Sequence, residues 1–285
     1  MKKNIVLFTT FYLLIKIFLN YQVIQNDVYM ICLVFFKKIF PSLFIFFIIS
    51  SILINYGFVE LISKIFGKLF RFLFNINNYQ SYIFIMSMLS GLPSNAKYIK
   101  ELLDSELIEE NDANHILLFS HFANPLFILF MGLNKPYLII LAHYLPNIII
   151  GLFIRGFKSS HKTNKINHVS KPFNKLLSDS ITSSFNTLLM VLGLIIIFNI
   201  IGNLTNSFIL KYILEMSSSV NYITTINISD KLKAMLVSGI LSFGGICVHM
   251  QVMSILNNKK IRYTPYLLAR LLHFCMSSLI IYLIY

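Results

Sequence analysis

Long apolar runs are the feature that most limits what this chain can fold into. Several of them approach the ~20 residues that a helix needs to cross a bilayer. They are continuous rather than alternating, which disfavours the strands of a membrane barrel. The sequence therefore predicts an all-α, polytopic integral membrane protein. The apolar runs are Ile5–Leu19, Pro41–Tyr56, Tyr82–Leu92, Ile116–Met131, Tyr137–Phe153, Ile181–Ile201, Ala234–Leu256 and Tyr266–Ile284.

The composition agrees with a lipid-embedded chain. Of the 285 residues, 56% are hydrophobic and only 12% are charged, roughly half the charged share of an ordinary globular protein. A net charge of +13 would suggest a nucleic-acid partner in a soluble protein. Here the lysines and arginines fall between apolar runs, where they anchor helix ends at lipid head groups. We therefore expect a lipid bilayer as the partner, and no nucleic acid.

The chain divides into four parts. Residues 1–36 are interpreted as N-terminal transmembrane segments, because no small-x-small cleavage site follows the first apolar run. Residues 37–155 form a first repeat with a connector helix at its end. Residues 156–180 are a basic, polar linker, and residues 181–285 form a second repeat.

The first repeat contains two unusual segments. Residues 58–71 have apolar positions at helical spacing, with Lys64, Lys68 and Arg71 on one stripe, which predicts a helix lying in the membrane interface. Next, Ser81–Ser90 is too short to span and runs into Gly-Leu-Pro, after which Ser94 or Asn95 can begin a new helix. This punctuation predicts a re-entrant hairpin.

The second repeat has the same order of features, with a break at Ser242–Gly245. If each hairpin enters and leaves on one side, three crossings separate equivalent points, and the two repeats have opposite orientations. Paired broken helices in inverted halves are the pattern of a transporter's substrate site.

Polar side chains at membrane depth are costly, so each carries a functional hypothesis. Ser94 and Asn95 either cap a helix or offer donors to a ligand. Lys97 either reaches the interface or offsets an anion, and His121, placed inside a helix, either bonds a carbonyl or acts in proton relay or ligand contact. Arg270 and His273 are expected to face inward from the last helix. The candidate substrate-binding residues are Ser90, Ser94, Asn95, Lys97, His121, Asn124, Ser242, His249 and Gln251.

The sequence carries no signature of an enzyme. It lacks the Gly-x-Ser-x-Gly elbow, His-Glu-x-x-His, the Walker loop and Cys-x-x-Cys. Cys32, Cys247 and Cys275 lie in apolar segments and suggest neither a disulfide framework nor a metal site. We therefore expect no enzyme activity, no cofactor and no metal.

Three motifs carry a resemblance to a known family. They are Ser90-Gly91-Leu92-Pro93-Ser94-Asn95-Ala96-Lys97, Ser120-His121-Phe122-Ala123-Asn124-Pro125-Leu126-Phe127, and Ser242-Phe243-Gly244-Gly245-Ile246-Cys247-Val248-His249-Met250-Gln251. With the segments before them, they resemble the nucleoside-recognition gate domain, and within that group the family of sporulation integral membrane protein YlbJ. The resemblance covers about residues 37–285.

The resemblance implies a multi-pass protein of the bacterial cell membrane that is needed for endospore formation, at the stage of the spore cortex. It also implies distant kinship with concentrative nucleoside transporters. Their first hairpin carries Gly-Gln-Thr-Glu where this chain has Gly91-Leu92-Pro93-Ser94, which argues against a nucleoside as ligand.

Two functions stay open at this point. The leading hypothesis is a transporter-like protein for an unidentified small molecule, with an unidentified coupling ion. The alternative is a non-transporting membrane scaffold that recruits cortex-assembly partners. A transporter requires the candidate residues to converge on one site, whereas a scaffold requires a dry core and a large exposed face.

Overall fold

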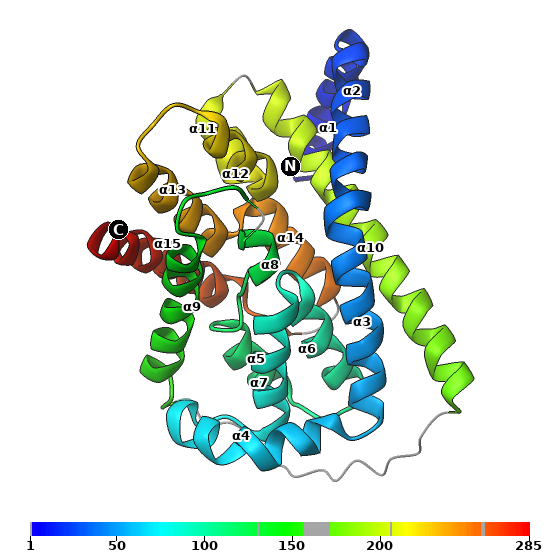
Figure 1. The fold of residues 1–285 in the computed structure, drawn as a ribbon. Coiled ribbons are helices and arrows are strands. Elements are labelled where there is room, and N and C mark those ends of the chain that lie inside the picture. The colour runs from blue at the N-terminus through cyan, green and yellow to red at the C-terminus, as the bar shows by residue number, and fades with distance from the viewer. Residues whose placement is uncertain (1, 130, 157–171, 206, 258–259) are drawn as a thin grey trace.

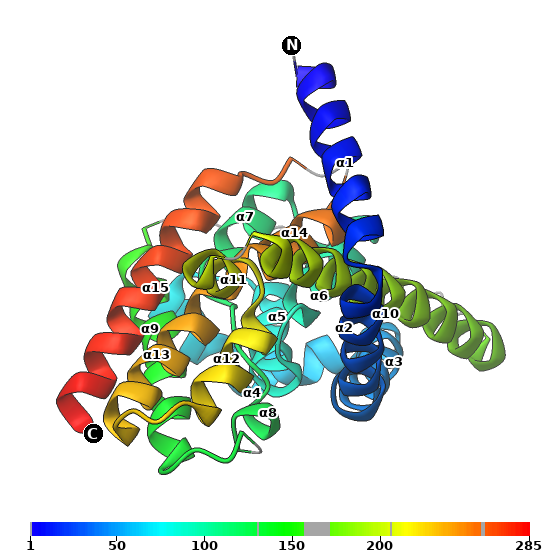
Figure 2. The ribbon, with the colours of Figure 1, turned by 90° about the horizontal axis from the view of Figure 1, so that it is seen from above.

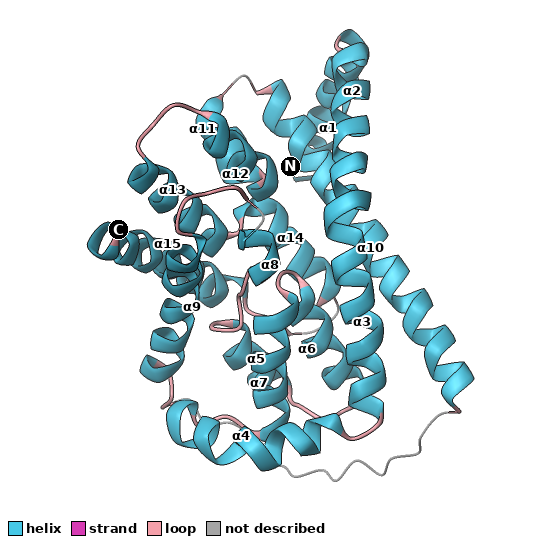
Figure 3. Ribbon diagram, viewed as in Figure 1, coloured by secondary structure: helices cyan, strands magenta, loops and turns pink. Residues whose placement is uncertain are grey.

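The computed structural model describes residues 2–129, 131–156, 172–205, 207–257 and 260–285, and within these ranges all regular structure is helical (Figure 3). In chain order the helices are α1 (Lys2–Leu19), α2 (Tyr21–Val34), η1 (Phe35–Ile39), α3 (Phe40–Asn55), α4 (Phe58–Phe74), α5 (Asn78–Ser90), α6 (Ser94–Asp104), α7 (Glu110–Leu117), α8 (Pro125–Leu129), α9 (Pro136–Phe153), α10 (Phe173–Leu204), α11 (Phe208–Leu214), α12 (Met216–Thr225), α13 (Asp230–Phe243), α14 (Gly245–Ile255) and α15 (Tyr263–Ile284).

The outer surface of the molecule is suited to lipid. Four helical segments of the described chain are long and apolar enough to cross a membrane, or up to six if each bent pair counts as one span. Large apolar side chains point outward from these segments, such as Leu268, Leu279 and Leu283 of α15, which are 56% to 71% exposed. The predicted class, a helical multi-pass membrane protein, is confirmed.

The helices α2, η1 and α3 follow one another as a long rod that packs along α10 (Figure 1). At one end of the rod α1 turns away from α2 by 96°, and at the other end α4 turns away from α3 by 86°. Asn20 ends α1 by donating a side-chain hydrogen bond to the carbonyl of Lys16, and Gly57 supplies the left-handed turn before α4 at a φ of 81°. By length and apolar character together, α1 and α2 qualify as a candidate span only as a bent pair.

Helix α4 has the geometry predicted for an interfacial helix. It buries Val59, Ile62 and Phe74 against the protein, while Ile65 and Phe72 are exposed. The basic stripe lies about a quarter-turn of the helix away from these exposed apolar residues. Its bend of 86° from α3, together with one apolar and one basic flank, is the geometry expected of a helix that lies along a membrane surface.

The first broken helix folds back on itself, as predicted. The rings of Tyr82 on α5 and Tyr98 on α6 lie 6.1 Å apart, although 16 residues of straight helix would separate them by ~24 Å. The hydroxyl of Tyr98 also donates to Oγ of Ser90 at 2.9 Å, which joins the two arms close to the bend. The α5–α6 hairpin is therefore antiparallel.

The prediction of a hairpin in the second repeat is wrong. Helices α13 and α14 together form one candidate span, Asp230–Ile255, interrupted at Gly244. The amide of Gly244 still donates to the carbonyl of Ile240, so the break is short. Helix α14 is mainly apolar and continues through the interior of the protein, whereas α6 carries several charges and turns back. The two repeats share an order of features but differ here, and their inverted duplication is not confirmed.

A third break replaces the helix that the sequence predicted over Ile116–Met131. Helix α7 ends at Leu117, residues 118–124 are not helical, and α8 begins at Pro125. The prediction that His121 lies inside a helix is therefore wrong. The physical reason is Pro125, which disfavours helical backbone at the residue before it.

The predicted linker is shorter than expected. Residues 157–171 lie outside the described residues, and α10 begins at Phe173, so the last part of the 156–180 segment is helical.

Asp230–Ile255 is the most deeply buried of the four candidate spans. In its apolar stretch 67% is buried inside the protein, compared with 28% in α15. Helix α14 lies between α10 and α15 in both views (Figures 1 and 2).

Candidate functional site

The three breaks bring buried polar side chains together in the middle of the molecule. They come from the start of α6, the 118–124 loop, α9, the end of α13 and α15. Each has an exposed fraction of 0%, so the group is closed to solvent in this structure. We call it the polar centre: Asn95, Ser120, His121, His143, Asn147, Ser242, Tyr266, Arg270 and His273.

Arg270 is the one arginine of the polar centre. Its guanidinium donates to the carbonyl of Leu118 and to Nδ1 of His273, the latter at 2.9 Å, and it lies 5.6 Å from the ring centre of Tyr266. Nε has no hydrogen-bond partner, and no carboxylate pairs with Arg270 anywhere in the described ranges. A buried cation without a counter-charge is costly, so the polar centre is short of one negative charge.

Two histidines of the polar centre are held as neutral rings. Nε2 of His143 accepts from the amide of Ala123 at 2.8 Å, so its Nδ1–H donates to Oγ of Ser242 at 2.9 Å. Nδ1 of His273 accepts from Arg270, so its Nε2–H donates to the carbonyl of His143 at 2.7 Å. The two rings stack at 4.8 Å. In both, the hydrogen bonds fix the tautomer, and a second proton would break one of them.

His121 is bound more loosely. Its Nδ1 lies 3.4 Å from the hydroxyl of Tyr266, and its Nε2 has no partner among the described residues. Nε2 of His121 faces the break at Gly244: a Cβ atom added to Gly244 would lie 3.0 Å from this nitrogen. Asn95, at the start of α6, reaches Oγ of Ser120 at 3.4 Å, and its Oδ1 has no partner within the described part of the chain. Within the described residues, the start of α6 and the 118–124 loop thus each carry an unpaired polar atom, and the one on the loop faces the second break.

Two of the candidate residues hold the first hairpin against this loop. Asn124 donates to the carbonyl of Ser90 at 3.2 Å, and its Oδ1 accepts from the amide of Leu126 at the start of α8. Oγ of Ser90 donates to the carbonyl of Met86. The side chain of Asn124 and the backbone carbonyl of Ser90 thus position the loop, whereas the hydroxyl of Ser90 bonds only within the hairpin. Ser94 is fully buried in the first turn of α6, next to Asn95.

Lys97 and Gln251 lie outside the polar centre. Nζ of Lys97 is 3.2 Å from a carboxylate oxygen of Glu101 and donates to Oγ of Ser183 on α10. Its charge is therefore balanced within the hairpin. The side-chain amide of Gln251 donates to Sγ of Cys247, one turn earlier on α14.

His249 stands at the edge of the polar centre. Its Nε2 donates to the carbonyl of Phe243, and its Nδ1 lies 3.1 Å from the hydroxyl of Tyr263. Its ring centre is 5.0 Å from that of Tyr266. The structure thus brings Asn95, His121, Ser242 and, at the border, His249 together.

The sequence analysis missed the contribution of α9. His143 and Asn147 belong to the segment that the sequence analysis interprets as a plain connector. The side-chain amide of Asn147 nevertheless donates to the backbone carbonyl of His121 at 2.7 Å. Their signal was available, because they are polar residues four positions apart within an apolar run and so share one helix face. Tyr266 was missed for a different reason, since a tyrosine near a helix end is also typical of the membrane interface.

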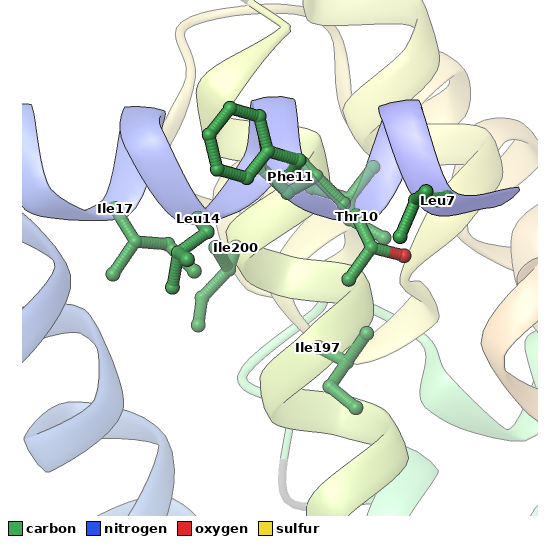
Figure 4. Close-up of a pocket in the computed structure, with 9 residues that line it drawn as sticks. Leu7, Thr10, Phe11, Leu14, Ile17, Ile197 and Ile200 are labelled. Atoms are coloured by element: carbon green, nitrogen blue, oxygen red, sulfur yellow. The ribbon is translucent and has the colours of Figure 1, made fainter. Parts of the chain in front are cut away.

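A groove between α1 and α10 is a separate feature (Figure 4). Its lining is aliphatic and aromatic apart from Thr10, and it includes Phe11, Leu14 and Ile197. It offers no charge or hydrogen-bonding group comparable with the polar centre, and its chemistry is that of a lipid-facing surface. In the described residues, no group of three His, Cys, Asp or Glu side chains is placed to hold a metal ion.

Comparison with known proteins gives one informative match. Sporulation integral membrane protein YlbJ of Bacillus subtilis (strain 168) is 28% identical over 303 aligned positions, covering 87% of this chain and 74% of the relative. The chain is thus similar to YlbJ over most of its length. It is therefore an integral membrane protein of sporulation, located in the cell membrane. No family model and no solved structure matches it, and the wider grouping with gate domains stays a prediction from the motifs.

Proposed function

We propose that this YlbJ-like protein is a transporter that moves a small anion across a membrane during endospore formation. The observation that carries the proposal is Arg270, which is fully buried in the polar centre without a carboxylate partner among the described residues. A small anion bound there would supply the missing negative charge.

The surrounding backbone favours the same ligand class. Helices α6 and α14 pack together, and each begins at a break beside the 118–124 loop. The first turn of a helix carries a partial positive charge, which favours an anion. Hydroxyl and amide side chains of Ser120, Ser242 and Asn95 would then fix the orientation of the ligand.

The closed state of the polar centre fits one step of a transport cycle. A transporter must hold its ligand away from both sides before it opens to one of them. The breaks in α5–α6, α7–α8 and α13–α14 provide points at which helix halves can shift without unfolding a complete span. The assignment to the spore-cortex stage rests on the family resemblance alone.

The test compares Arg270→Gln with Arg270→Lys in the sporulating host. Small anions are measured by mass spectrometry in mother cells and in purified spores, beside membrane levels of the protein. We expect Arg270→Gln to accumulate normally, yet to lose at least ~90% of the transfer of one anion, because the charge is absent. Arg270→Lys keeps the charge and should retain part of it.

A scaffold gives a different result. If both variants accumulate normally and heat-resistant spores are lost without any change in the distribution of an anion, the protein does not transport one. If Arg270→Gln leaves both spores and anions unchanged, Arg270 has no role in function.

A further inference from the structure

We infer that His121 carries a proton that crosses the membrane together with the anion. This inference rests on the proposed function, because it assigns the coupling ion and its carrier in the same site. It starts from a difference among the three histidines of the polar centre, which are otherwise equally buried.

His143 and His273 cannot take up a proton without losing a hydrogen bond. In each ring one nitrogen accepts a bond from an amide or guanidinium donor, and the other donates. His121 differs, since its Nε2 has no partner within the described ranges. In the tautomer that carries its proton on Nδ1, His121 donates to the hydroxyl of Tyr266, and Nε2 keeps a free lone pair that accepts a second proton without breaking a bond.

The charges around His121 link its proton to the anion. The groups that face it are Tyr266, Arg270 and His273 from α15, His143 from α9 and His249 from α14. Arg270 contacts both Tyr266 and His273, whose rings lie 6.2 Å and 6.1 Å from that of His121. A protonated His121 would place a second positive charge beside Arg270, which is unfavourable at low dielectric. An anion bound between them removes this penalty.

Proton and anion therefore favour each other's binding. On one side of the membrane a proton from water forms an N–H bond at Nε2 as the anion binds Arg270 and the two helix starts. On the other side that N–H bond breaks as the anion leaves, and the proton returns to water. The ring of His121 is then neutral again, and Arg270 has no carboxylate partner among the described residues, as in this structure. Binding of each ligand lowers the free energy of binding the other by the same amount.

The test uses the full-length protein reconstituted in liposomes. The liposomes are given the low-molecular-mass anion fraction extracted from sporulating cells, with and without an acidic exterior, and their contents are measured by mass spectrometry. We expect wild type to accumulate one anion at least ~5-fold more when the exterior is acidic. In His121→Gln the same anion should enter, but without this dependence on the pH gradient.

His115→Gln is the matched control, since His115 is equally buried but packs beside Phe119, outside the polar centre. It should keep the response of wild type. If wild type takes up an anion regardless of the pH gradient, or if His121→Gln responds as wild type does, the proton inference is overturned and anion transport stands. If wild type takes up no anion, anion transport and the proton inference fail together.

Discussion

The α5–α6 and α13–α14 breaks follow nearly the same sequence punctuation but have opposite geometry. The first reverses the chain, so that Tyr98 returns to the level of Tyr82. The second interrupts a span that continues through the membrane. The comparison teaches that glycine permits a break, while the polarity of the following helix decides its direction. Both breaks nonetheless begin a new helix beside the same loop, which is what builds the polar centre.

The largest effect is expected at the first break. Gly91 has a φ of 82°, and an added Cβ would lie 2.4 Å from the amide nitrogen of Asn124, a backbone atom that cannot move aside easily. We expect Gly91→Ala to cost about 4 kcal/mol, from backbone strain and overpacking together. The measurement is membrane accumulation and the thermal midpoint in detergent. Gly193→Ala, which meets open space, is the control. A Gly91→Ala protein as stable as this control would refute the packing of the hairpin on the loop.

A smaller effect is expected from the charges that turn α6 back. Glu101→Gln leaves the buried ammonium of Lys97 without its carboxylate. Breaking a buried ion pair costs ~3–5 kcal/mol, and partial exposure of Glu101 reduces this to about 2 kcal/mol. The loss is checked by thermal unfolding in detergent. Combining Glu101→Leu with Lys97→Met should recover most of the stability, because it removes both charges. If the double variant is less stable than Glu101→Gln, the pair is not what stabilises this arm.

The smallest effect on stability is expected at the second break, with a clear effect on function. Gly244 has a φ of 87°, and an alanine there costs ~1–2 kcal/mol of backbone strain. Its Cβ would press on the ring of His121, a side chain that can shift. Gly244→Ala should therefore reach the membrane at near-normal levels but give at least ~10-fold fewer heat-resistant spores. If a stable Gly244→Ala protein gives normal spore counts, the conformation of this break is not needed for function.

The sequence predicted the local features of the fold. The apolar runs, the interfacial helix and the first hairpin follow from residue order within one segment, such as Gly-Leu-Pro followed by the charged face of α6. The direction of α14 relative to α13 could not be predicted in this way, because the same glycine turn is compatible with a chain reversal and with a short interruption of a straight span. That direction depends on the apolar character of α14, which is visible in the sequence.

The candidate site was predictable in part. Asn95, His121 and Ser242 were chosen because polar groups are costly at membrane depth, and they do meet. The partners that give these residues their chemistry come from distant segments, as when His143 of α9 bonds Ser242 of α13. Such pairings depend on tertiary packing. For the same reason, no local sequence pattern indicates that Arg270 has no carboxylate partner among the described residues.

The most direct test of the central claim asks whether the polar centre opens to water. Ser120→Cys is placed in a background lacking Cys32, Cys247 and Cys275, and is treated with a membrane-impermeant thiol reagent from each side. Ala113→Cys, equally buried outside the polar centre, is the control. A transport site predicts that Ser120→Cys is labelled from both sides, at least ~10-fold faster than Ala113→Cys, and more slowly when the anion fraction of sporulating cells is present. Labelling as slow as that of Ala113→Cys from both sides would contradict transport and show a dry, structural core.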